Sequence, residues 1–127
     1  MIISLGEIML SVAHGFGALF EQHPSVGAAI VPFAALVIVL SVWWVYFCEE
    51  DHLPTTDFGT ALIWGYGHVF IFMATAALGA TIAASVDVAT HHAKAEQADV
   101  STWLGASLAL YCLTLWIVRD RVLALSA

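Results

Sequence analysis

The longest apolar run in the sequence, residues 58–86, contains no aspartate, glutamate, lysine or arginine. Further apolar runs cover residues 2–20, 28–47 and 103–118. A helix needs about 20 residues to cross the hydrocarbon core of a bilayer, which is about 30 Å thick. The second and third runs meet this length, the first just meets it, and the fourth is short. We therefore predict an all-α fold, a four-helix transmembrane bundle.

The composition supports lipid as the outer solvent of this bundle. Of the 127 residues, 61% are hydrophobic and only 10% are charged, whereas soluble domains carry about 25% charged residues. None of the polar connections between the runs is long enough to divide the chain. We expect a single transmembrane domain over residues 1–127, with both termini on the same side of the membrane. Ser101 is expected to cap the fourth helix.

Basic residues are scarce, because Lys94, Arg119 and Arg121 are the only lysines and arginines of the chain. The net charge of −7 and the lack of a basic stripe exclude a nucleic-acid-binding protein. The two arginines follow the fourth run and favour a cytoplasmic C-terminus, since basic residues concentrate on the cytoplasmic side. Lys94 alone opposes them, so insertion of the chain in both orientations stays open.

Two ionisable residues of the first run share one helix face. Glu7 and His14 are seven residues apart, which is close to two full helical turns. Charged side chains are costly in a bilayer, so such residues normally face a bundle interior, pair with each other or mark an ion or proton path. A purely structural Glu7, protonated or hydrogen-bonded, stays open beside the functional interpretation.

The third run carries a stripe of polar and aromatic residues. Asp57, Trp64, His68 and Thr75 are separated by seven, four and seven residues, so they fall on one broad helix face. Small and polar residues on such a face favour close contact between membrane helices. We expect the stripe to be an interface, in which His68 bonds to Glu7 or to an aromatic ring of the same stripe.

The aromatic group WWVYF closes the second run. Tryptophan and tyrosine concentrate at membrane–water interfaces because their rings are apolar and their tips are polar. Trp43, Trp44 and Tyr46 are therefore predicted membrane-interface anchors.

The sequence contains no HExxH, no phosphate-binding loop and no nucleophile elbow. We predict no enzyme activity and no metal site. His14 and His68 are possible ligands of a haem or a pigment, because neutral imidazole is a common axial ligand. The identity of any cofactor is left open.

The order of the motifs resembles that of the low temperature requirement A (LtrA) family of bacterial membrane proteins. IISLGEIMLSV is similar to that family's LGE helix, and WWVYF followed by WGYGH is similar to its paired WW-x-YF and YGH signature. The fourth run, LGASLALYCLTLWIVR, resembles the family's final helix. The matching positions are Glu7, Trp43, Trp44, Tyr66, Gly67 and His68. Because the chain resembles only the C-terminal part of these longer proteins, the resemblance implies a helical fold in the bacterial inner membrane and no particular reaction.

Three functions stay open. The preferred one is a structural or accessory subunit of a membrane oligomer or larger complex, whose partners are the lipid bilayer and further copies of the chain or other membrane subunits. The alternative is a homo-oligomeric ion or proton channel or transporter that uses Glu7, His14 and His68. The third is a haem- or pigment-binding membrane subunit. The subunit function is preferred because it needs no catalytic residue and because polar helix faces in a membrane need other helices to pack against them.

Overall fold

The chain is helical over almost all the residues that its computed structural model describes, namely 1–21, 26–48, 58–90 and 93–121. The helices are α1 (Ile2–Glu21), α2 (Val26–Phe47), α3 (Phe58–Ala89) and α4 (Gln97–Leu115), and a π-helical segment, η1 (Trp116–Arg121), continues α4. Helices suit such apolar runs because backbone groups that enter lipid must find their hydrogen-bond partners within the same segment.

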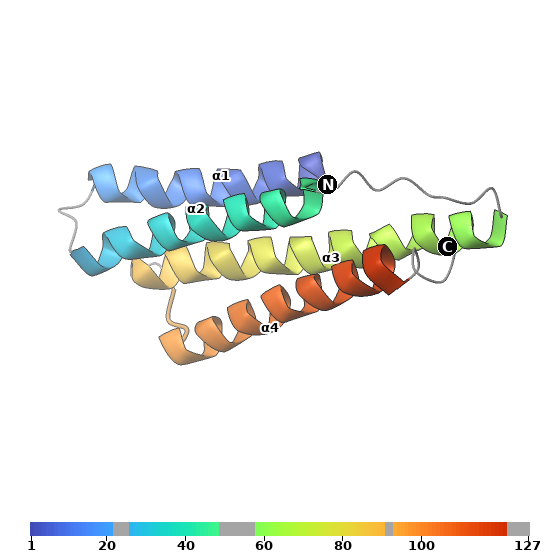
Figure 1. The fold of residues 1–127 in the computed structure, drawn as a ribbon. Coiled ribbons are helices and arrows are strands. Elements are labelled where there is room, and N and C mark those ends of the chain that lie inside the picture. Colours follow the sequence, from blue (N-terminus) through green and yellow to red (C-terminus); the bar gives the residue numbers. More distant parts are fainter. Residues whose placement is uncertain (22–25, 49–57, 91–92, 122–127) are drawn as a thin grey trace.

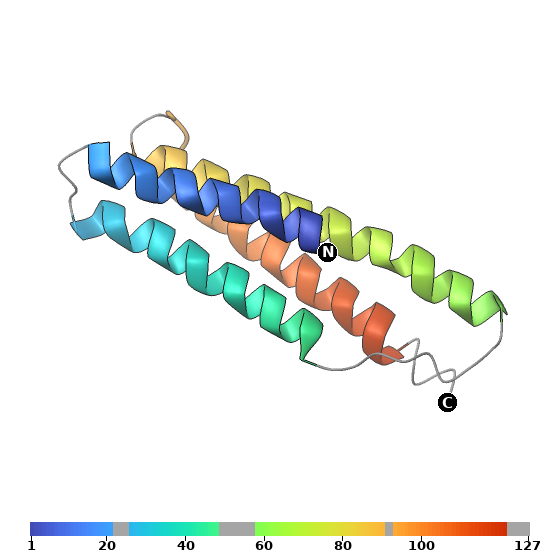
Figure 2. The same ribbon diagram turned by 90° about the horizontal axis from the view of Figure 1, so that it is seen from above.

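The four helices lie side by side along one long axis (Figure 1). Successive helices run in opposite directions, so α1 is parallel to α3 and α2 is parallel to α4 (Figure 2). Helix α3 is the centre of the bundle, because it packs against α1, α2 and α4. The beginning of α1 and the end of α4 lie at the same end of the bundle. That this end faces the cytoplasm stays a prediction.

The core is formed by side chains that all four helices direct toward the axis of the bundle. Its buried members are Leu5, Ile8, Val12, Ala35, Val39, Val42, Ile71, Ala74, Leu78, Ile82, Tyr111, Leu115 and Val118. Large apolar residues also cover the outside, and Phe33, Trp44, Phe70 and Trp103 are each more than half exposed. An apolar surface on all sides is what a bundle surrounded by lipid requires.

Three segments are long and apolar enough to span a membrane: Ala29–Phe47, Phe58–Ala89 and Gln97–Asp120. Among the side chains described, the apolar part of α1, Ile2–Gly17, is shorter. The prediction of a short fourth helix over 103–118 is therefore wrong. The prediction left out residues 97–102 because most of them are polar. In the structure they form the first turns of the same helix.

The prediction that Ser101 caps the fourth helix is also wrong. The helix begins at Gln97, with Glu96 in the N-cap position. The Ser101 hydroxyl lies inside the helix and donates a hydrogen bond to the Gln97 carbonyl at 2.8 Å. Serine bonds back to the preceding turn in this way when no free backbone N–H is within its reach.

Candidate functional site

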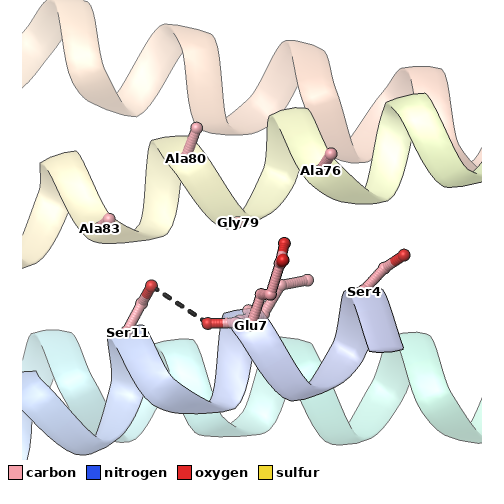
Figure 3. A pocket seen from close by; sticks show the side chains of 8 residues that line it. Ser4, Glu7, Ser11, Ala76, Gly79, Ala80 and Ala83 are labelled. Atoms are coloured by element: carbon pink, nitrogen blue, oxygen red, sulfur yellow. Dashed lines mark hydrogen bonds between the residues drawn. The ribbon is translucent and has the colours of Figure 1, made fainter. Parts of the chain in front are cut away.

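An open groove runs between α1 and α3 on the outside of the bundle (Figure 3). It has a volume of about 230 Å³. Its lining consists of Ser4, Glu7, Ile8 and Ser11 from α1 and Ala76, Gly79, Ala80 and Ala83 from α3. Apart from Ile8 and Glu7, every lining side chain is small, so the groove leaves room for another helix to approach closely.

The close approach of α1 to α3 depends on Gly79. A β-carbon added to Gly79 would lie 2.8 Å from Cγ1 of Ile8. Ile8 is almost completely buried at this contact. The contact therefore sets the register of the two helices and brings the second turn of α1 level with a point about two-thirds of the way along α3.

The Glu7 side chain extends from α1 toward α3 in the middle of this groove (Figure 3). The Ser11 hydroxyl donates to the backbone carbonyl of Glu7 at 3.4 Å and not to its carboxyl group. No described side chain forms a hydrogen bond or an ion pair with that carboxyl. A charged side chain at the centre of a bilayer costs about 2.5–3.5 kcal/mol, less nearer the interface. The groove thus contains a polar group that a partner would stabilise.

His14 continues the polar side of α1 beyond the groove. It is exposed, whereas its neighbour Gly15 is buried, and a β-carbon on Gly15 would lie 3.1 Å from Val86 and 3.2 Å from Pro32. Ser4, Glu7, Ser11 and His14 are separated by three, four and three residues, the spacing of one helix face. We call these four residues the polar stripe of α1.

His68 lies in a separate cluster of aromatic rings. Its Nδ1 is 2.8 Å from the Trp64 carbonyl oxygen. A carbonyl oxygen only accepts, so Nδ1 carries the hydrogen and Nε2 of a neutral ring is left as an acceptor. The ring centroids of Trp64, Phe72 and Tyr46 are 4.4, 6.2 and 6.3 Å from that of His68. Nε1 of Trp64 is buried and has no hydrogen-bond partner in the part of the chain that the structure describes.

The structure does not bring Glu7, His14 and His68 together within one chain. Glu7 precedes Ile8, which contacts Gly79, and Gly79 lies about 16 Å along α3 from His68 at the helical rise of 1.5 Å per residue. His14 precedes Gly15, which contacts Val86, about 27 Å along α3 from His68. The expected bond from His68 to Glu7 is therefore absent, and His14 and His68 of one chain cannot ligate the same haem.

The remaining residues of the predicted stripe have local partners. The buried Thr75 hydroxyl donates to the Ile71 carbonyl at 2.7 Å and lies 3.9 Å from the sulfur of Met1. Trp64 packs on His68, as the shared face predicts. Asp57 lies outside the described residues.

The predicted anchors lie in the last turns of α2. Trp43 and Trp44 are exposed, while Tyr46 is half-buried against His68 and Phe47. The neighbouring Val45 carbonyl accepts a hydrogen bond of 2.8 Å from Arg119, which closes the C-terminal end of α2.

A sequence profile of the bacterial low temperature requirement A (LtrA) proteins matches residues 1–127, the whole chain. The chain belongs to the LtrA family. With three helices long and apolar enough to span a membrane, this LtrA family member is a membrane protein. Neither the curated proteins nor the solved structures give a significant match.

The positions through which the sequence resembles the LtrA family occupy three places in the fold. Glu7 lies in the groove, and Trp43 and Trp44 lie near the end of α2. Tyr66 is exposed, whereas Gly67 faces η1, where an added β-carbon would lie 2.8 Å from Val118. The glycine of the YGH motif thus permits a close contact between α3 and η1.

Sequence reasoning missed several polar residues. Ser4 and Ser11 line the groove with Glu7, and their heptad spacing was a signal that could have found them. Tyr111 donates to the Val42 carbonyl at 3.0 Å, and the hydroxyls of Thr81 and Ser107 lie 3.2 Å apart. Sequence spacing cannot reveal these contacts, because they join different helices. Within the described residues, no group of three or more His, Cys, Asp or Glu side chains could hold a metal ion.

Proposed function

We propose that this LtrA family member is a structural subunit of a membrane assembly, and that a transmembrane helix of another subunit packs into the groove between α1 and α3. The observation that carries the proposal is the Glu7 carboxyl, which has no described partner in a groove of small residues on the outer face of the bundle. We also propose that this assembly lies in the bacterial inner membrane.

Two physical arguments support an occupied groove. Lipid tails are as apolar as leucine, so membrane helices associate through close packing and hydrogen bonds rather than through hydrophobic burial. Ala76, Ala80 and Ala83 permit such packing because their short side chains let the backbone of another helix come close to α3. A hydrogen-bond donor on the incoming helix would also remove the cost of leaving Glu7 against lipid.

A proton or ion path is the second candidate, and the polar stripe of α1 favours it. A path through one chain would need Glu7, His14 and His68 to be near one another, and their contacts keep them apart. Parallel copies arranged as a ring could instead turn their polar stripes toward a common axis. This function therefore requires a parallel arrangement of copies.

A substitution that fills the groove tests the subunit proposal. Ala80 and Ala77 are both exposed alanines of α3, but only Ala80 lines the groove. We expect Ala80→Leu to reduce the mass of the complex extracted in mild detergent to that of one subunit, because leucine occupies the space of the docked helix. Ala77→Leu is the matched control and should leave the mass unchanged. An unchanged mass in Ala80→Leu would rule the proposal out.

A further inference from the structure

Within the polar stripe of α1, Glu7 and His14 lie nearly symmetrically about the middle of the helix. Helix α1 extends over Ile2–Glu21, and the midpoint between Glu7 and His14 falls close to its centre. The two side chains therefore lie at similar distances from the two ends of the helix, on the same face and both exposed. A carboxyl group and an imidazole are complementary, because one proton can form a hydrogen bond between them.

We propose that the helix in the groove is α1 of a second copy of this chain, which runs antiparallel so that Glu7 of each copy bonds to His14 of the other. The inference rests on the proposed groove and names its occupant. One two-fold axis, in the plane of the membrane and near Ser11, generates both bonds. Each ionisable residue then has a partner at its own depth in the bilayer, and a two-fold contact closes the assembly.

The antiparallel arrangement fits the charges of the chain better than a parallel one. In a parallel pair the two Glu7 carboxyls would face each other at one depth, and the two His14 rings at another, so like groups would meet. An antiparallel pair requires both orientations of the chain in the membrane. The small difference in basic residues, Lys94 on one side against Arg119 and Arg121 on the other, gives the chain little preference for either orientation.

Cysteine cross-linking distinguishes the arrangements. The native Cys48 and Cys112 are exposed and would first be replaced by serine. Near the two-fold axis, Ser11→Cys is expected to form a disulfide-linked dimer in native membranes. Ser4→Cys alone is expected to stay monomeric, because two copies of it would be about 20 Å apart along the helix axis. The double variant Ser4→Cys with Gly17→Cys should cross-link, since these positions, like Glu7 and His14, lie at equal distances on opposite sides of the axis, and an added β-carbon on Gly17 has nothing within 4 Å.

The control is Met9→Cys, because Met9 is exposed on α1 but does not line the groove. It should not cross-link. Equal cross-linking of Ser4→Cys and Ser11→Cys would show a parallel pair and overturn the proposal in favour of the ring that a proton path requires. No cross-link at Ser4, Ser11 or Gly17, together with a loss of mass in Ala80→Leu, would identify a different protein as the occupant. The subunit proposal would then stand while this inference fails.

A charge exchange provides a second, independent measurement. Glu7→His and His14→Glu should each lower the dimer fraction about tenfold, because either change removes both symmetric hydrogen bonds, worth about 0.6 kcal/mol each between membrane helices. The combined variant exchanges the two groups and restores complementarity in the antiparallel pair, so its dimer fraction should recover. Failure of the combined variant to recover, although it inserts into the membrane in the same amount as the unchanged chain, would overturn the pairing.

Discussion

At the residue scale, the polar groups of this membrane protein differ in where they find their partners. His68 donates to the carbonyl of Trp64 one turn earlier in the same helix, and Thr75 donates to Ile71 in the same way. Tyr111 instead bonds across the bundle to Val42 of α2. Glu7 has no bonding partner among the described residues. Local bonds leave helices free to rotate and slide, whereas the Tyr111 bond fixes α4 against α2.

Tyr111→Phe tests the value of this interhelical bond. Because the ring remains and only the hydroxyl is lost, we expect the free energy of unfolding in detergent to fall by about 0.5–1.5 kcal/mol. Tyr66→Phe is the matched control, since the Tyr66 side chain is exposed and should change stability little. Equal effects of the two substitutions would show that the bond to Val42 contributes nothing measurable.

At the scale of elements, glycines decide how closely the helices meet. Gly79 admits Ile8 at the contact of α1 with α3, and Gly67 admits Val118 at the contact of α3 with η1. Both glycines lie in the interior of α3, where glycine costs helix stability. Close packing offsets that cost in a membrane, where close helix contact is a main source of association. The long helix α3 can therefore serve as the centre of the bundle.

Gly79→Ala should separate α1 from α3. The added methyl group meets Ile8 at 2.8 Å, so we expect a loss of about 1–3 kcal/mol in the free energy of unfolding. Gly105→Ala adds a methyl group where nothing lies within 4 Å and serves as the control. In a double-mutant cycle, Ile8→Ala should recover part of the loss because it removes the clashing atoms. Independent, additive effects would contradict the contact.

At the scale of the whole molecule, the two cysteines report how the bundle lies in the membrane. Both are exposed, but Cys48 follows the end of α2, whereas Cys112 lies within the spanning segment Gln97–Asp120. We therefore expect the exposed Cys48 thiol to contact water and the exposed Cys112 thiol to contact lipid. The two thiols should differ sharply in their reaction with polar reagents, because the thiolate that reacts needs water around it.

A membrane-impermeant maleimide should label Cys48 and not Cys112 in membranes made accessible from both sides. Cys48→Ser identifies the labelled site, and denaturation in detergent should make Cys112 reactive as well. Labelling of Cys112 in intact membranes would show that water reaches the middle of α4, and would contradict a lipid-facing position.

Much of the fold was predictable from the sequence, and the site only in part. Apolar runs over 28–47 and 58–86 predicted the two middle helices, because lipid leaves such runs few alternatives to a helix. The fourth helix was predicted too short, since hydropathy marks the part in lipid and not the polar turns that extend it to Gln97. Helical spacing placed Glu7 and His14 on one face, and Trp64 beside His68.

The sequence by itself determined which residues are helical, which of them share a face, and that the chain belongs in a membrane. Only the tertiary structure decided that Glu7 lies in a groove lined by alanines of α3 and not beside His68, and that Gly79 and Gly67 are points of close helix contact. Spacing defines a face around the axis of one helix. The rotation and register of two helices depend on side-chain contacts between them, which in lipid come from packing and hydrogen bonds that no single segment encodes.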